Sequence, residues 1–233
     1  IQGVNLAFSD GILVVPTNAG VVMGIELLTR SLVWAHSYRE ATAPANVAGQ
    51  PGPGVQKKVF VNGQMNNGPV LNLNQERWRS SAPIIVNGKV IFTAYDGASV
   101  QCLNLRDGKF IWKSPRSADD LYLAGVHNDK VIIVNKNSMR AIDLNDGKKI
   151  HWTLNSGMPA GHGVTGANST YYLPVKAAPD TKEPEVWAID LNEGKILSRT
   201  KSRKKHAPGN LLFYEGDVYS QTPWELAAYP QLQ

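Results

Sequence analysis

The sequence is poor in several features that define common protein classes. Cys102 is the only cysteine among 233 residues, so no disulfide can form within this chain, and we expect its thiol to act as a small buried apolar group. No apolar run reaches the roughly 18 residues that a membrane-spanning helix needs. The formal charge of +5 is too modest and too dispersed to indicate nucleic-acid binding, although it favours acidic partners.

What the sequence does contain is an internal repeat. A Gly-Lys pair begins at Gly108, Gly147 and Gly194, so it recurs after 39 and then 47 residues. A strand-like segment of small, apolar and then acidic or polar residues precedes each pair, and further copies of that segment occur at 24–27 and 227–229. Repeats of this length with four strands each are typical of the radial blades of a β-propeller.

Tight turns divide each repeat into four short apolar strands. Asn87-Gly88 and Asn145-Asp146-Gly147 supply residue types that take the positive φ of hairpin turns. A single four-stranded sheet cannot bury both of its faces, so the repeats must stack on one another. The sequence therefore predicts an all-β protein of antiparallel four-stranded blades, at residues 4–35, 82–113, 120–152, 163–200 and 210–229, with the first strand of the fourth blade at 163–167.

The segments 141–148 and 188–195 resemble the repeat of the pyrroloquinoline-quinone-type β-propellers, whose signature is Ala-Leu-Asp-x-x-x-Gly-Lys-x-x-Trp. The likeness covers most of the chain outside residues 41–79. It extends to the repeat regions of large exported bacterial proteins and to the lipoprotein of the outer-membrane β-barrel assembly machinery. The resemblance implies that the tryptophan of each repeat packs between neighbouring blades, as we expect of Trp34 and Trp112. Ser198 stands at that position in the fourth copy, which predicts a looser or differently filled junction.

The number of blades is incomplete for this family. Four blades and a fifth that lacks its last strand make about four and three-quarter blades, whereas such propellers usually close with seven or eight. The chain begins at Ile1, inside a strand pattern, without Met and without a visible signal peptide. We therefore expect residues 1–233 to be one partial propeller domain whose partner is the remainder of its own propeller in a longer chain. The resemblance also implies a bacterial protein that is periplasmic or otherwise exported.

The long connections should all emerge on one face of the propeller. In an antiparallel blade, the loops between the second and third strands leave from the same face as the loops between blades. This set contains the long or unusual loops 39–79, 176–184 and 201–208, and we call the surface that carries them the loop face. Residues 39–79 form a long insertion between blades, rich in Gly and Pro, in which short strands are expected near 58–63 and 70–73. Binding residues concentrate on loops held by a rigid scaffold, so the loop face is the candidate functional surface.

Basic residues gather on this surface. The candidate partner-binding residues are Lys57, Lys58, Lys201, Arg203, Lys204, Lys205 and His206. The alternative is that 201–206 is an ordinary solvated loop, and no interleaved aromatic residues suggest nucleic acid.

No catalytic, cofactor-binding or metal-binding residue can be assigned. His162 between two glycines lacks a second ligand at metal-binding spacing. Asp119-Asp120 most simply terminates a turn, and the repeated acids Glu26, Asp143 and Asp190 are expected to bond turn amides because they recur in several blades.

Two functions follow from these observations. The first is a non-enzymatic propeller scaffold that binds a protein through the loop face, whose basic residues favour an acidic partner. The second is part of a quinone-dependent dehydrogenase, which the resemblance raises. Many such enzymes hold the quinone against a disulfide of adjacent cysteines, and the lone Cys102 cannot supply one, so the scaffold is favoured.

Overall fold

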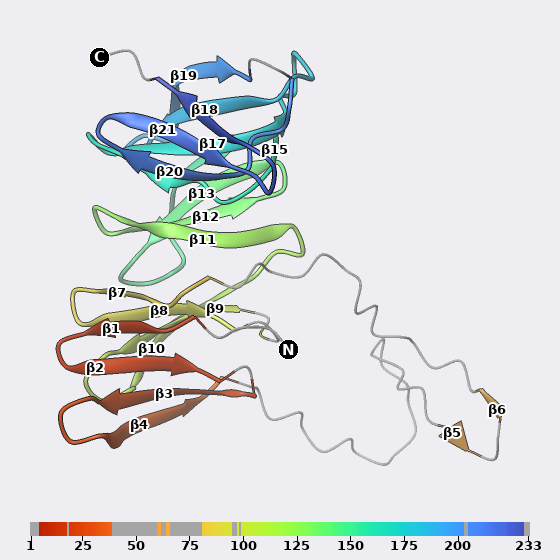
Figure 1. Ribbon diagram of the computed structural model, residues 1–233. Helices are drawn as coiled ribbons and strands as arrows, with labels where there is room; N and C mark the ends of the chain where they lie inside the picture. The colour runs from red at the N-terminus through yellow and green to blue at the C-terminus, as the bar shows by residue number, and fades with distance from the viewer. Residues whose placement is uncertain are drawn as a thin grey trace.

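The structure is a row of antiparallel sheets packed face to face, with no helix among the residues it describes. It is a computed structural model, and it describes residues 5–17, 19–38, 60–61, 64–65, 81–94, 97, 99–202 and 205–230. Figure 1 shows the five larger sheets following one another in chain order. The predicted all-β propeller blades are therefore confirmed.

The first three blades each contain four strands in simple meander order. The first blade comprises β1 (Ala7–Ser9), β2 (Ile12–Pro16), β3 (Val21–Glu26) and β4 (Ser31–Ser37). The second comprises β7 (Ile84–Val86), β8 (Lys89–Thr93), β9 (Ser99–Asn104) and β10 (Phe110–Pro115). The third comprises β11 (Asp120–His127), β12 (Lys130–Asn135), β13 (Ser138–Asp143) and β14 (Ile150–Asn155). The bounds of these three blades lie within a few residues of the predicted ranges 4–35, 82–113 and 120–152.

The fourth blade differs from the prediction in its first strand, which was expected at 163–167. Two short strands, β15 (Met158–Pro159) and β16 (Val164–Thr165), both pair with β17 (Thr170–Ala177), which continues to β18 (Glu185–Asp190) and β19 (Lys195–Lys201). Glycine permits this interruption because a Cβ on Gly163 would overlap Tyr172 O and the Tyr171 ring. The sequence pattern located the second piece of the strand and missed the first.

The fifth blade has three strands within the described residues. They are β20 (Asn210–Tyr214), β21 (Asp217–Gln221) and β22 (Leu226–Tyr229). The pairing of Tyr219 with Ala228 places Ala228, rather than Ala227, in the column of small residues that holds Cys102 and Ala141 in other blades. The repeat at 227–229 is thus shifted by one residue from the alignment that the sequence suggested.

In the insertion 39–79, the structure describes a two-stranded hairpin of β5 (Phe60–Val61) and β6 (Gln64–Met65). The first overlaps the strand expected near 58–63. The strand expected at 70–73 lies outside the described residues.

Indole rings connect the first four blades. Trp34, Trp112 and Trp152 form a tryptophan column in which each side chain is at most 8% exposed. Each Nε1 donates a hydrogen bond to a main-chain carbonyl oxygen of the next blade: 2.7 Å to Leu105, 2.8 Å to Leu144 and 3.0 Å to Leu191, respectively. The expected burial of Trp34 and Trp112 between blades is confirmed.

One extra residue in the third blade does not displace its tryptophan from this column. Trp152 stands one position later after its glycine than Trp112 does. The turn between Gly147 and Ile150 absorbs the additional residue, so Trp152 still pairs with Ala141 as Trp112 pairs with Cys102. A β-bulge precedes each tryptophan, and it turns the indole toward the next blade.

Candidate functional site

The two faces of the propeller differ in the way predicted. On one face the connections are tight turns with residues at positive φ, such as Gly11, Gly88 and Gly216. On the opposite, loop face, the chain has longer connections after β17 and after β19. The connection between β21 and β22, Thr222–Glu225, also lies on the loop face and was not singled out in the sequence because it is short.

The loop between β17 and β18 is held in place by its own main chain. Ala178 N donates to Glu183 O at 2.9 Å, and Lys182 N donates to Ala178 O at 2.9 Å. Ser202 N, beyond the end of β19, donates to Pro184 O at 2.9 Å. The loop is therefore a fixed part of the loop face and is tied to the neighbouring connection.

Arg199 anchors the same loop through its side chain. Its guanidinium donates two hydrogen bonds to Asp180, at 2.8 and 2.6 Å, and one to Glu185 at 2.7 Å. It also lies 4.9 Å from the Trp187 ring centroid. Burial raises the pKa of Glu185, but hydrogen bonds from Arg199, Trp187 and Thr181 outweigh it, so the net pKa lies below its usual value. Arg199, Asp180 and Glu185 have a structural role, because they are already hydrogen-bonded to one another.

The predicted basic cluster is partly neutralised. Lys201 Nζ lies 2.7 Å and Lys205 Nζ 3.7 Å from the same carboxylate, that of Glu183. The hydrogen bond from Lys201 holds the pKa of Glu183 below its ordinary range. His206 Nδ1 lies 3.3 Å from Glu225. Four further predicted residues fall outside the described part of the chain: Lys57, Lys58, Arg203 and Lys204.

The other candidate residues have structural surroundings. His162 packs on the Tyr122 ring with centroids 4.2 Å apart. Asp120 is fully buried, accepts a hydrogen bond from Ser117 N at 2.9 Å and pairs with Arg140, so it fixes a turn as expected. Within the described ranges, no three His, Cys, Asp or Glu side chains gather closely enough to hold a metal ion.

Two of the three repeated acids bond turn amides, as predicted: Asp143 Oδ1 accepts from Asn145 N at 2.7 Å, and Asp190 Oδ1 accepts from Asn192 N at 2.7 Å. The third, Glu26, instead accepts a hydrogen bond from the Thr29 hydroxyl at 2.5 Å. The hydrogen bond from Asn145 N is the main cause that lowers the pKa of Asp143. Their recurrence therefore reflects the construction of the blade.

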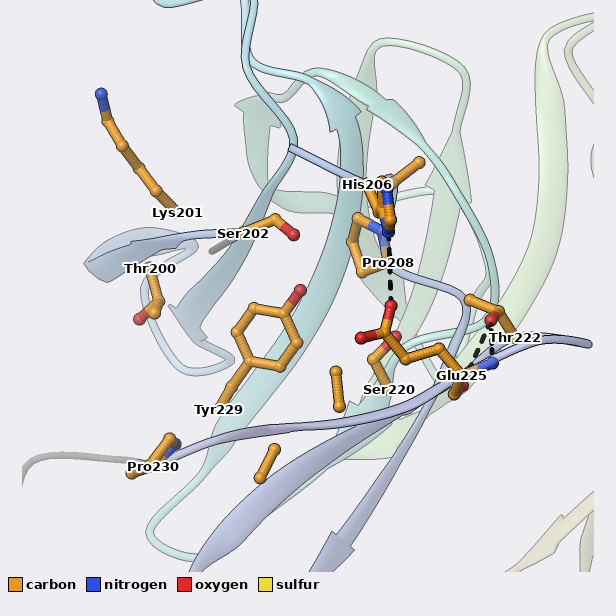
Figure 2. Close-up of a pocket in the computed structure, with 13 residues that line it drawn as sticks. Thr200, Lys201, Ser202, His206, Pro208, Ser220, Thr222, Glu225, Tyr229 and Pro230 are labelled. Atoms are coloured by element: carbon orange, nitrogen blue, oxygen red, sulfur yellow. Dashed lines mark hydrogen bonds and ion pairs between the residues drawn. The ribbon is translucent and has the colours of Figure 1, made fainter. Parts of the chain in front are cut away.

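A hollow of about 400 Å³ opens between the fourth and fifth blades on the loop face. Figure 2 shows Tyr229 in its middle and the His206–Glu225 pair at its side. The lining comes from the end of β19, the following connection, β21, the turn after it and β22: Thr200, Lys201, Ser202, His206, Ala207, Pro208, Ser220, Thr222, Glu225, Ala227, Ala228, Tyr229 and Pro230.

Trp224 stands at the rim of this region and was missed in the sequence. Its side chain is 93% exposed, in contrast to the buried tryptophan column. Thr222 Oγ1 fixes the turn that carries it by accepting hydrogen bonds from Glu225 N at 2.9 Å and Trp224 N at 3.3 Å. The available signal was a tryptophan outside the repeat column, directly after Pro223 in a turn. An exposed tryptophan on a fixed turn is a common feature of binding surfaces.

Comparison with known proteins identifies similar β-propellers. No family model matches the sequence. An outer membrane protein assembly factor BamB from Alkalilimnicola ehrlichii is 25% identical over 143 residues, which cover 56% of this chain and 34% of that protein. Crystallised BamB from Moraxella catarrhalis superposes with a TM-score of 0.63 at 13% identity, over 97% of this chain and 56% of the other. Quinohemoprotein alcohol dehydrogenase from Comamonas testosteroni gives 0.58 at 14% identity, over 94% and 40%.

The chain has the fold of the quinoprotein-type β-propellers. The resemblance read from the Gly-Lys repeats and the tryptophan column is thereby confirmed. The quinoprotein-type fold is shared by an assembly factor and a dehydrogenase, so the fold alone does not select a function. The chain spans about a third of the length of the curated relative that it matches, 34%.

No part of the described chain forms a helix with the length and hydropathy needed to cross a membrane.

Proposed function

We propose that the chain is part of a non-enzymatic β-propeller scaffold that binds a protein through its loop face. The observation that carries the proposal is the exposed Trp224, held on a hydrogen-bonded turn beside the hollow between the fourth and fifth blades. The fixed loop 178–184 lies on the same face, so the surface is preorganised and loses little conformational entropy on binding. The similarity to a protein described as an outer membrane protein assembly factor supports a scaffold role.

The proposed partner surface is acidic. Lys201 and Lys205 share one carboxylate, Glu183, so neither lysine has a carboxylate of its own among the described residues. Arg203 and Lys204 add positive charge in the sequence, as do Lys57 and Lys58 on the insertion. Together with His206, these are the proposed partner-binding residues. Contacts of this kind should speed association and weaken as salt rises.

We propose the domain context and the cellular location of the scaffold from the same similarity. The five blades would belong to one propeller domain, with 39–79 as its insertion and with the remainder of the propeller supplied by a longer chain. A periplasmic or otherwise exported bacterial protein fits the curated relative, whose name gives it a role in the assembly of outer membrane proteins.

The quinone-dependent dehydrogenase is the weaker alternative. Cys102 is fully buried in β9 and stands alone, so it cannot form the disulfide of adjacent cysteines that many such enzymes place against the quinone. Reconstitution of the purified chain with pyrroloquinoline quinone and Ca²⁺ tests this alternative directly. Quinone-dependent dye reduction with an alcohol would overturn the scaffold proposal.

The scaffold proposal is tested by cross-linking and affinity capture in extract of the source organism. One variant changes the loop face by Lys201→Ser with Lys205→Ser and by deletion of residues 48–54. The matched control changes the opposite face by Arg106→Ser with Lys148→Ser. We expect the loop-face variant to lose the captured protein and the control to retain it, and we expect capture by the unaltered chain to fall as NaCl rises. The reverse pattern would show that the functional face is misassigned.

A further inference from the structure

The hollow between the fourth and fifth blades marks a position where the repeat pattern is broken. The third strand of each blade carries one residue of the column of small residues. The residue directly before it is large in blades two to four, where it is Gln101, Arg140 and Trp187, but in blade five it is Ala227. The register fixes this equivalence, since each pairs with the fourth residue of the preceding strand. Three large side chains therefore correspond to one methyl group.

At the junction of the first two blades, the equivalent space is filled by interlocking side chains. His36 Nε2 lies 3.2 Å from Gln101 Oε1, and Gln101 Nε2 donates to Tyr38 O at 3.5 Å. The residues of the fourth blade that correspond to His36 and Tyr38 are Thr200 and Ser202, both small.

The junction of the third and fourth blades is filled in another way. Trp187 is 2% exposed and packs in one core cluster with Trp152 and the partly buried Leu154. At the junction of blades four and five, no comparable side chain is present at Ala227, and Ser198 replaces the column tryptophan. The hollow of about 400 Å³ lies beside β22, the last described strand of the fifth blade, where large side chains of the protein pack at two other junctions.

The lining suits a neutral aromatic group. Its floor and walls are largely apolar, formed by Ala207, Pro208, Ala227, Ala228 and Pro230 around the Tyr229 ring. The polar groups at the mouth are engaged, since Lys201 pairs with Glu183. His206 Nδ1 lies 3.3 Å from Glu225 (Figure 2). An anion placed inside would have to displace these pairs and lose its hydration, whereas an aromatic ring would only remove apolar surface from water.

We propose that this hollow is a binding site for an aromatic side chain of the partner, presented on an extended peptide segment with acidic flanking residues. The inference rests on the proposed scaffold function and names the chemistry of its partner. An aromatic ring there would replace the filling that Gln101 and Trp187 give to other junctions. A volume of about 400 Å³ is within the usual range of roughly 300–1,000 Å³ for binding pockets.

Trp224 extends the site toward solvent. A second hollow of about 470 Å³ is lined by Trp224 together with His206, Ala207, Thr222 and Glu225, the last four of which also line the first hollow. The indole therefore stands where the peptide would leave the pocket, and it can pack against the neighbouring peptide main chain.

The test uses two fluorescently labelled heptapeptides that differ at one position. Each has acidic residues at both ends and glycine beside the centre, and the centre is either tryptophan or alanine. Fluorescence anisotropy against the purified chain, up to about 1 mM protein, should give at least tenfold tighter binding for the tryptophan peptide. Equal binding of the two peptides, or no binding of either, would overturn the proposal.

Three variants locate the site. Ala227→Trp fills the hollow with the side chain that Trp187 provides in the fourth blade, and it should abolish the tenfold preference while the melting temperature stays equal or rises. Ala227→Gln, which copies Gln101 of the second blade, serves the same purpose if the first variant does not fold. Ala118→Trp adds an indole to an exposed turn elsewhere on the loop face and should leave the preference unchanged. A preference that survives both Ala227 substitutions would refute this pocket.

The two proposals can fail separately. If Ala227→Trp keeps the partner captured from extract while the loop-face variant loses it, the scaffold stands and the aromatic pocket is wrong. If neither variant changes capture, the loop-face scaffold itself is wrong.

Discussion

The indole of Trp34 lies directly over Gly108 of the next blade. An ideal Cβ placed on Gly108 would be 2.6 Å from Trp34 Cδ2, and the glycine has a φ of +66°. The Nε1 of the same indole donates to Leu105 O at 2.7 Å. The glycine of the Gly-Lys repeat is therefore required twice, once by its own turn and once by the tryptophan of the preceding blade.

Gly108→Ala should destabilise the protein more than a turn substitution alone would. A Cβ at positive φ costs about 1–2 kcal/mol, and overlap with the indole adds roughly 1–3 kcal/mol. Gly88→Ala is the matched control, because Gly88 has a φ of +68° and nothing within 4 Å of the added Cβ. Urea denaturation of both variants measures the difference. Equal losses of stability in the two variants would mean that the Trp34 indole moves aside without an energetic cost.

Trp112→Ala should lower the free energy of unfolding by about 3–5 kcal/mol, the range for deleting a large core aromatic side chain. The residue is 4% exposed and its ring packs over Gly147. Trp112→Phe keeps most of the packing but leaves Leu144 O without the indole N–H, at a cost of about 1–3 kcal/mol. Equilibrium denaturation that showed a loss below about 1 kcal/mol for the alanine variant would contradict a structural role for the column.

Arg199→Met should be strongly destabilising near neutral pH, by about 3–5 kcal/mol, because it leaves the buried Glu185 carboxylate without its cation. Lys195→Met is the control: it removes an exposed pair with Glu193 and should cost at most about 1 kcal/mol. Thermal melts of both variants at neutral pH compare the two losses.

The pH dependence of the Arg199 variant follows from Glu185. In the native protein the pKa of Glu185 is below its ordinary value of 4.5, so its stabilisation is present above about pH 4.5 and is lost as the pH falls. The variant should show the opposite pH dependence of stability at this group, because without the guanidinium the burial of Glu185 favours its protonated form. Melting temperatures measured from pH 7 to pH 4 should therefore converge for the two proteins, and a constant gap would contradict the account.

Cys102 should react with thiol reagents only when the protein unfolds. The side chain is fully buried, and burial raises the pKa of its thiol from 9.0 to about 12, so almost no thiolate is present at pH 8. Ellman's reagent should modify the native chain slowly and the urea-denatured chain within minutes. Fast reaction without denaturant would place Cys102 at a surface instead.

Much of the fold could be read from the sequence because a propeller repeats its local signals. The Gly-Lys turns and alternating apolar strands indicated five blades, and their bounds agree with the structure at β8–β14. The broken first strand of blade four escaped, because nothing in the sequence shows that Gly163 lies against Tyr171 and Tyr172, or that Gly161 lies against the main chain of Gly209 and Asn210. The register of β22 escaped for a similar reason, since two adjacent alanines leave the small column ambiguous until pairing with β21 fixes it.

The blades, the buried tryptophans and the unequal faces were specified by the sequence alone, because they depend on turn chemistry and periodicity within one repeat. The pairing of charged side chains and the hollow between blades depend on how separate segments of the chain pack together. Glu183 is far in sequence from Lys201 and Lys205. Its ion pairs with them form only because β18 and β19 bring two loops together. The hollow at Ala227 likewise exists only between blades, where the side chain missing from one sheet leaves space that the neighbouring sheet does not fill.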